Sequence, residues 1–232
     1  MKNDIRNERD RRDDRQYVFH ETILRKVAVA VIGTTLKAFM QLHVEGLENL
    51  PGSGAVVLAS NHLSNLDVFP MQLALSRPLF FMGKAELFKN PVLGWFLRQL
   101  GGFPVQRGVS DQWALNHARK VLDEGLILAM FPEGTRSKGK GLSVAKTGAA
   151  RLAIEKEVPI IPVAHFGSDG IFTNFPRRGH VHVVIAKPIM AESDDDPLSL
   201  TDRVMFSLAN LLPKQMRGVY SEIPTGFKNL ER

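Results

Sequence analysis

Short apolar runs alternate with helical patterns from about residue 44 onward, and this alternation predicts most of the fold. Each run is almost continuously apolar, as expected for strands that are covered on both faces. Between the runs, apolar residues recur every three or four positions, which is typical of helices packed on a sheet. The pattern favours an α/β fold with a mostly parallel central sheet flanked by helices. The predicted strands span residues 55–59, 79–82, 103–105, 126–131, 160–164 and 181–186, and the predicted helices span 66–75, 91–99, 111–123, 147–156 and 201–212.

The N-terminal part of the chain has a different pattern. Residues 1–16 are almost all polar and nearly charge-balanced, whereas residues 17–43 predict one or two helices. In the second stretch Phe19, Ile23 and Val27 recur every four residues, beside further apolar positions. A helix with so broad an apolar face either packs on the core or lies in a membrane interface.

We expect three segments along the chain. Residues 1–43 form an amphipathic helical segment, residues 44–212 form the α/β domain, and residues 213–232 form an irregular C-terminal tail. No secretory signal is expected, because the first residues are polar and charged. The most apolar N-terminal stretch, residues 27–36, is too short to span a bilayer.

The composition is that of a globular protein with a modest basic excess. The 232 residues are 44% apolar, include no cysteine and carry a formal net charge of +6. Without cysteine there is no disulfide, no thiolate nucleophile and no cysteine-based metal site. The charge fits nucleic acid, an anionic membrane or phosphorylated substrates, or it only keeps the protein soluble. Nucleic-acid binding is not supported, because the sequence has neither zinc-finger spacing nor a basic repeat with interleaved aromatics.

A histidine and an aspartate follow the first predicted strand and could form a base with its supporting carboxylate. His62 and Asp67 are five residues apart. A neutral imidazole is a good base near pH 7, and a carboxylate on its second ring nitrogen fixes the tautomer. On one helix the two would point about 140° apart, so His62 must lie in the turn before the helix. Taken alone, the pair also fits a simple helix start, with Ser64 as N-cap and Asp67 completing a capping box.

A second polar turn, after another apolar run, contains Glu133, Gly134 and Arg136. Glycine lets a ligand approach the backbone, and arginine grips a phosphate or carboxylate with its planar fork. The basic residues that follow Arg136 favour an anion site. An internal Glu133–Arg136 pair in an ordinary turn is the alternative.

The predicted strands place several of these side chains at one edge of the sheet. His62 follows the first strand, Lys84 the second, Arg107 the third and Glu133 the fourth. If these strands are parallel, all of these residues emerge at the carboxyl-end edge, where open α/β sheets bind ligands. His165 also ends a predicted strand, but the sequence assigns it no role.

Taken in order, four segments resemble the phospholipid/glycerol acyltransferase family, the group that contains the bacterial 1-acylglycerol-3-phosphate acyltransferases. The resemblance covers roughly residues 44–190, and no block departs from the pattern of the family. Lys84 also looks like a family feature. The blocks are His-x4-Asp from His62 to Asp67, Gly-x4-Arg from Gly102 to Arg107, Phe-Pro-Glu-Gly-Thr-Arg-Ser over 131–137 and Val-Pro-Ile-Ile-Pro-Val over 158–163.

The resemblance implies the glycerolipid acyltransferase fold and an O-acyltransferase. A fatty acyl group would move from acyl-CoA or acyl carrier protein to the sn-2 hydroxyl of 1-acyl-sn-glycerol 3-phosphate, giving phosphatidic acid. His62 would be the general base, oriented by Asp67. No metal and no cofactor are implied beyond the acyl-thioester co-substrate. The implied phosphate- and glycerol-binding residues are Lys84, Arg107, Glu133, Gly134 and Arg136.

The partners implied by the resemblance are a lysophospholipid acceptor, the acyl thioester and a membrane surface, with no nucleic acid. Because acceptor and product are lipids, we expect residues 1–43 to dock on the cytoplasmic face of the cell membrane, as a peripheral or monotopic element. Two alternatives stay open. One is the same chemistry on glycerol 3-phosphate, another lysophospholipid or a lyso-aminolipid, and the other is a catalytically silent lipid-binding protein on this fold.

Overall fold

A seven-stranded sheet organises the chain, in the strand order β1-β7-β6-β2-β5-β3-β4. This computed structural model describes Arg12, Tyr17 and residues 22–108, 110–137, 139–168 and 177–223. All neighbouring strands are parallel except β6 and β7, which are antiparallel. The predicted fold class, a mostly parallel sheet flanked by helices, is confirmed. The strands are β1 (Met40–Glu45), β2 (Val56–Ser60), β3 (Leu79–Lys84), β4 (Gly102–Val105), β5 (Ile127–Met130), β6 (Ile160–Phe166) and β7 (Gly179–Ile185).

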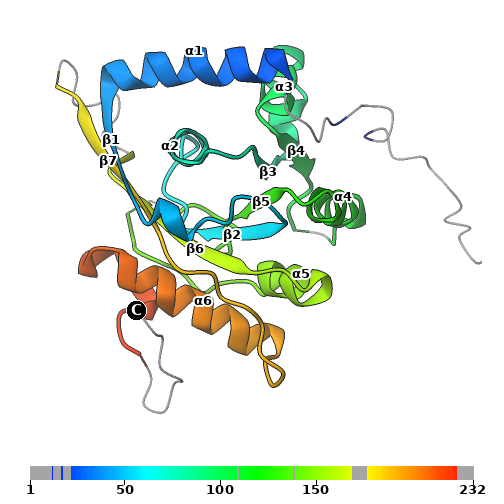
Figure 1. Cartoon of the computed structure of the whole chain (residues 1–232), viewed down its shortest axis with the longest axis vertical. Coiled ribbons are helices and arrows are strands. Elements are labelled where there is room, and N and C mark those ends of the chain that lie inside the picture. Colours follow the sequence, from blue (N-terminus) through cyan, green and yellow to red (C-terminus); the bar gives the residue numbers. More distant parts are fainter. Residues whose placement is uncertain are drawn as a thin grey trace, which may run out of the picture.

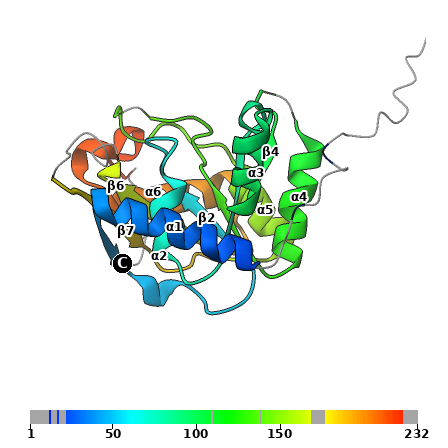
Figure 2. The same ribbon diagram turned by 90° about the horizontal axis from the view of Figure 1, so that it is seen from above.

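Helices cover both faces of this sheet (Figures 1 and 2). Apolar side chains of α1, α2 and α3 pack on one face, and those of α4, α5 and α6 pack on the other. The central strands therefore lie between two apolar layers, which explains why every residue of β2 is buried. The helices are α1 (Ile23–Phe39), α2 (Val68–Ala74), α3 (Pro91–Gln99), α4 (Gln112–Asp123), α5 (Gly148–Lys156) and α6 (Pro197–Leu211).

The prediction of helix throughout residues 17–43 is wrong at its C-terminal end. Helix α1 ends at Phe39, and β1 follows at once and pairs with β7 in parallel. In β1 the side chains of Gln41, His43 and Glu45 are exposed and alternate with less exposed ones, as expected for an edge strand with one face on the core. The boundary of the α/β domain therefore lies before β1, and not at residue 44.

A buried arginine fixes α1 on the body of the protein. Arg25 is only 3% exposed, and its guanidinium donates to the Gln72 side chain at 3.1 Å and to the Leu79 carbonyl at 3.0 Å. It also lies 4.9 Å from the centre of the Phe80 ring, within the range of a cation–π interaction. These contacts join the start of α1 to α2 and β3.

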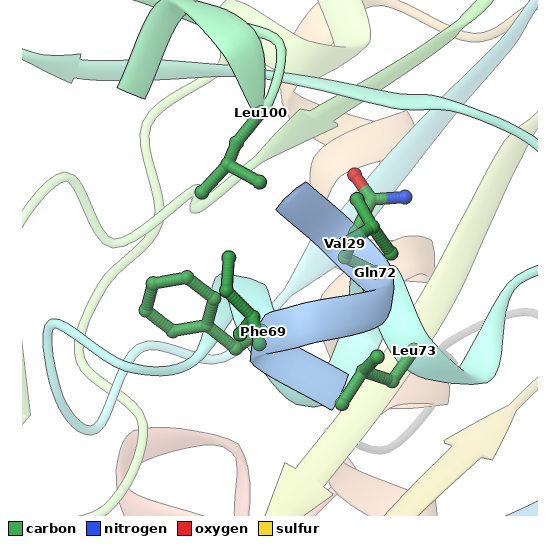
Figure 3. Close-up of a pocket in the computed structure, with 6 residues that line it drawn as sticks. Val29, Phe69, Gln72, Leu73 and Leu100 are labelled. Carbon is green, nitrogen blue, oxygen red and sulfur yellow. The ribbon is translucent and has the colours of Figure 1, made fainter. Parts of the chain in front are cut away.

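The inner face of α1 packs on α2 with little space between them. Figure 3 shows Val29 near Phe69, Gln72, Leu73 and Leu100, around a crevice of about 10 Å³. The outer face is different, because Ile23 and other apolar side chains of α1 are exposed. The two readings of this apolar helix therefore apply to its opposite faces: one packs on the core, and the other is free to meet a partner.

The C-terminal segment packs on the α/β domain up to Tyr220, and the described part of the chain ends at Ile223. Two 3-10 helices, Lys214–Met216 and Gly218–Tyr220, follow α6. The Tyr220 ring meets Phe206 edge-on at 5.2 Å, and its hydroxyl accepts the Ala145 N–H at 3.1 Å. The last residues of the predicted tail, 224–232, lie outside the described part.

Within the described ranges, none of the helices is long and apolar enough to cross a membrane.

Candidate active site

His62 and Asp67 form the hydrogen-bonded pair that the sequence predicts. His62 follows the end of β2 by two residues, and Asp67 directly precedes α2. Nδ1 of His62 lies 2.8 Å from Oδ2 of Asp67. Because a carboxylate only accepts, Nδ1 carries the proton and Nε2 is left as the basic nitrogen. His62 is 8% exposed and lines a pocket, so the arrangement is that of a general base with access to a ligand.

The Asp67 carboxylate is fully buried and is surrounded by donors. Burial alone would raise the pKa of Asp67, but the close contact with His165 and the hydrogen bonds from His62 and the backbone of Ser64 hold this pKa well below its usual range. Asp67 is therefore an anion throughout the physiological range. Its partners are His62 Nδ1 at 2.8 Å, Leu63 N at 2.7 Å and Ser64 N at 2.8 Å on the one side, and Ser64 Oγ at 2.9 Å, Ser168 Oγ at 3.1 Å and His165 Nε2 at 3.1 Å on the other.

Asp67 makes one of the contacts of the alternative role, a capping box, but not in the helix that a capping box requires. In a capping box, the side chain of the third helical residue accepts the N–H of the N-cap residue, and Asp67 does accept the Ser64 N–H. However, Asp67 is not the third residue of a helix, because α2 begins only at Val68. The Ser64 hydroxyl accepts the Leu66 N–H and donates to Asp67. The carboxylate thus closes the turn after β2 and holds His62 with the same oxygen, so the contacts of a helix start and those of a supported imidazole occur together.

Glu133 lies behind the His62 turn and not in the pocket. Its side chain is buried, and its Oε1 accepts the His62 N–H at 3.0 Å. Its Oε2 accepts the N–H and the hydroxyl of Ser143, each at 3.0 Å. Gly134 has a φ of +67°, and a Cβ there would meet the Lys146 side chain at 3.1 Å. Glu133 shapes the site indirectly, by joining the chain at His62 to the loop at Ser143, and Gly134 leaves room for the Lys146 side chain.

A pocket of about 210 Å³ opens beside His62 at the carboxyl ends of the strands. Because β2, β5, β3 and β4 are parallel neighbours, residues that follow these strands share one edge, as predicted. Lys84, Arg107 and Arg136 line the pocket as cations, and each is exposed. The remaining lining residues are mostly apolar: Val68, Phe69, Phe81, Met82, Leu87, Leu97 and Phe131, with Asn65 and Gly83.

Phe131 contacts the His62 ring on another side. Its ring stacks on the His62 ring, with the centres 4.2 Å apart and the planes 19° apart. The carbonyl of His62 accepts the Ser137 N–H at 2.8 Å. The turn at 131–137 therefore holds both the ring and the backbone of His62, which explains why this polar turn lies so close to the base.

Sequence reasoning missed the residues beneath Asp67. His165 and Ser168 contact the carboxylate, and Asn61 bonds both backbone groups of His165 through its amide, at 2.8 and 2.9 Å. These contacts join the turn after β2 to the end of β6, about a hundred residues away in sequence, so no local sequence pattern predicts them. The only available signal was that His165 ends a strand next to the predicted edge.

Two further histidines, His180 and His182, lie on β7 and do not line the pocket. His43 stacks on both of them, with ring centres 5.7 and 4.9 Å apart. Nε2 of His43 lies 3.4 Å from Nδ1 of His180. Across the described residues, no group of three or more acidic or histidine side chains is arranged to hold a metal ion.

Comparison with known proteins agrees with this site. The model of the Acyltransferase family matches residues 41–165, a span that includes the His62 turn, the 131–137 turn and the whole pocket lining. The chain therefore belongs to the acyltransferase family. The solved structure of the 1-acyl-sn-glycerophosphate acyltransferase PlsC from Thermotoga maritima matches with a TM-score of 0.63 and 26% identity, over 81% of this chain and 79% of that one.

Relatives of known name are also similar to this chain. The chloroplastic 1-acyl-sn-glycerol-3-phosphate acyltransferase LPAT1 of Arabidopsis thaliana is 34% identical over 164 residues, which is 68% of this chain and 46% of that protein. The 1-acyl-sn-glycerol-3-phosphate acyltransferase of Bacillus subtilis is 32% identical over 143 residues, which is 61% of this chain and 70% of that protein. The chain spans about half the length of the plant relatives that it matches.

The position of Glu133 predicts a stability effect. In Glu133→Ala, the buried N–H of His62 and the N–H of Ser143 lose their acceptor, so we expect the free energy of unfolding to fall by about 1–3 kcal/mol. Urea denaturation measures this. Glu48→Ala, at an exposed position of the 3-10 helix Leu47–Asn49, is the control and should leave the midpoint in place. Equal midpoints for the two variants would contradict the structural role of Glu133.

Proposed function

We propose that the protein moves a fatty acyl group from acyl-CoA or acyl carrier protein to the sn-2 hydroxyl of 1-acyl-sn-glycerol 3-phosphate, which gives phosphatidic acid. The observation that carries this proposal is the His62–Asp67 pair at the edge of a pocket lined by three cations. The names of the similar bacterial and plant proteins support the choice of 1-acyl-sn-glycerol 3-phosphate as the acceptor.

In this proposal His62 acts as the general base. Nε2 takes the proton of the acceptor hydroxyl while that oxygen attacks the thioester carbonyl. The tetrahedral intermediate then expels the thiolate, which recovers the proton from His62. Asp67 keeps Nδ1 protonated and stabilises the imidazolium that forms between the two steps. A positioned base of this kind supplies about 10²–10⁴-fold in rate.

Lys84, Arg107 and Arg136 bind the phosphate of the acceptor. A phosphomonoester is close to a dianion at neutral pH, and cations with N–H donors form short, charge-assisted bonds to it. Lys84 can exchange its present partner for a phosphate, because that partner, Glu86, is a half-exposed carboxylate 3.5 Å away. The apolar wall of the pocket, which includes Phe69, suits the acyl chains. No step of this reaction uses a metal or a resident cofactor.

The proposal includes docking of α1 on the cytoplasmic face of the cell membrane. The outer face of α1 exposes Ile23 (83%), Val31 (61%) and other apolar side chains, bordered by the exposed Lys26 and Lys37. An apolar stripe with lysines along one side suits an anionic bilayer surface. Helix α3 contributes a further exposed apolar side chain, Trp95, which is 47% exposed. This helix comes shortly after the 3-10 helix Ala85–Phe88, which contains the pocket residue Leu87. A lipid acceptor would then reach the pocket from the membrane.

The reaction is tested by thiol release from palmitoyl-CoA in mixed micelles, with and without lysophosphatidate. We expect acceptor-dependent release by the wild type and a loss of about 10²–10⁴-fold in kcat for His62→Ala, because the base is gone. Arg151→Ala, at an exposed position of α5 outside the pocket lining, is the control and should keep wild-type rates.

The acceptor series separates the alternatives. Glycerol 3-phosphate and a lysophospholipid without a free phosphomonoester are assayed beside lysophosphatidate. Faster thiol release with either of these acceptors would assign that acceptor to the protein in place of lysophosphatidate. No release with any acceptor, from palmitoyl-CoA or from acyl carrier protein donors, would contradict the proposal that the protein is an acyltransferase. Undiminished release by His62→Ala would contradict the assigned base.

Membrane docking predicts that one charge on the outer face of α1 weakens binding to vesicles. We expect Val31→Glu to lower the fraction bound to phosphatidylglycerol-containing liposomes several-fold in a flotation assay, because a carboxylate is costly in the interface and is repelled by anionic lipid. Val219→Glu is the matched control, since Val219 is 59% exposed in the C-terminal segment on the other side of the sheet.

Equal flotation of Val31→Glu and Val219→Glu would contradict docking through α1. A point substitution is the sharper test here, because a deletion of residues 1–43 would also remove most of β1 and disturb its pairing with β7. Exposed positions on α1 can be changed without touching the sheet.

A further inference from the structure

A second histidine lies against the Asp67 carboxylate, on the side opposite His62. His165, in β6, is fully buried. Its Nε2 is 3.1 Å from Oδ1 of Asp67, and its Nδ1 is 3.0 Å from Oγ of Ser60. The backbone of His165 is fixed by the two bonds to Asn61. The ring is therefore held in one place, with one nitrogen facing an anion and the other facing a hydroxyl.

The hydroxyl of Ser60 determines the protonation of Nδ1. Ser60 has a single hydroxyl proton, and its Oγ lies 2.6 Å from the carbonyl oxygen of Val163. Two oxygens approach this closely only with a proton between them, so the Ser60 proton belongs to the Val163 bond. Ser60 then has only lone pairs for His165. Nδ1 must donate, and it carries a proton.

The carboxylate determines the protonation of Nε2. The contact with Oδ1 is within ion-pair distance but is not aligned as a hydrogen bond. An unprotonated Nε2 would direct its lone pair at a buried anion, which is repulsive. A proton there turns the contact into an attraction between charges. Counting protons over Ser60, His165 and Asp67 thus leaves His165 with both ring nitrogens protonated.

We propose that His165 is a cationic positioning residue, which forms a buried ion pair with Asp67, fixes the direction of the carboxylate that contacts His62 and neutralises the charge of that carboxylate. The role in the reaction rests on the proposed function. His165 does not reach the pocket and touches no substrate. It acts through Asp67, whose Oδ2 is left to the base.

The ion pair has a consequence for the base. With His165 charged, the Asp67–His165 pair is neutral, and His62 faces a compensated carboxylate. Removing the positive charge would leave an uncompensated anion beside His62 and favour the protonated form of the base. Among the described residues, the other charged groups near His62 are Glu133, which accepts the His62 N–H, and the pocket cations Lys84, Arg107 and Arg136, and none of them is changed by substitution of His165.

The ion pair itself is tested without any activity measurement. Long-range ¹H–¹⁵N correlation spectra of the ¹⁵N-histidine-labelled wild type report the protonation of each ring nitrogen, and His165→Gln identifies the signals of His165. We expect both nitrogens of His165 to be protonated near pH 7. A His165 ring with one unprotonated nitrogen would overturn the proposal.

The effect on the reaction is tested with His165→Gln, because the glutamine amide can replace the Nε2–H donor but not the charge. We expect kcat to fall by about 10- to 100-fold with an unchanged KM for the donor. The acidic limb of the pH–rate profile should move up by about one pH unit. The control is His117→Gln, since His117 is also buried but stacks on Trp113 and packs against Phe103 in another part of the core.

The controls distinguish the possible failures. If His165 only filled space, both glutamine variants would lower the melting temperature and leave the acidic limb in place, and this outcome would overturn the positioning role. If the wild type transferred no acyl group to any acceptor, the proposed function would fail, and the spectra alone would decide whether His165 is the cation.

Discussion

The structure of this site depends on one buried carboxylate. Asp67 has no contact with water and is stabilised by donors from the turn that it closes, from β6 and from the loop after β6. A buried anion without such partners would be strongly destabilising, so the turn after β2 can adopt only the conformation that supplies them. His62 is one of these donors. Its orientation is thus fixed by the same interaction that makes the turn stable.

The parallel sheet explains why the rest of the site lies within reach of that turn. Strands β2, β5, β3 and β4 end at one edge, and the base and the three cations follow these strands in different parts of the sequence. Helix α1 lies on one face of the sheet, fixed by the buried Arg25, and leaves its outer apolar face exposed. A surface suited to lipid and a pocket suited to a phosphate are therefore both parts of one rigid frame.

Much of this could be predicted from the sequence, because apolar runs identify strands that are covered on both faces. All six predicted strands lie within two residues of observed ones. The edge strand β1 was missed, since alternating polar residues after a long apolar helix give only a weak signal. The role of Glu133 as a support for His62, and the contact of His165 with Asp67, depend on partners 71 and 98 residues away, which no local pattern contains.

The central claim is that the Asp67 carboxylate makes His62 a base by keeping the proton on Nδ1. The most direct measurement is kcat of Asp67→Asn at saturating palmitoyl-CoA and lysophosphatidate. An asparagine amide can donate to Nδ1 and reverse the tautomer, so the account predicts a loss of about 10²–10⁴-fold in a variant that still unfolds cooperatively. A folded Asp67→Asn protein with the rate of the wild type would contradict the account.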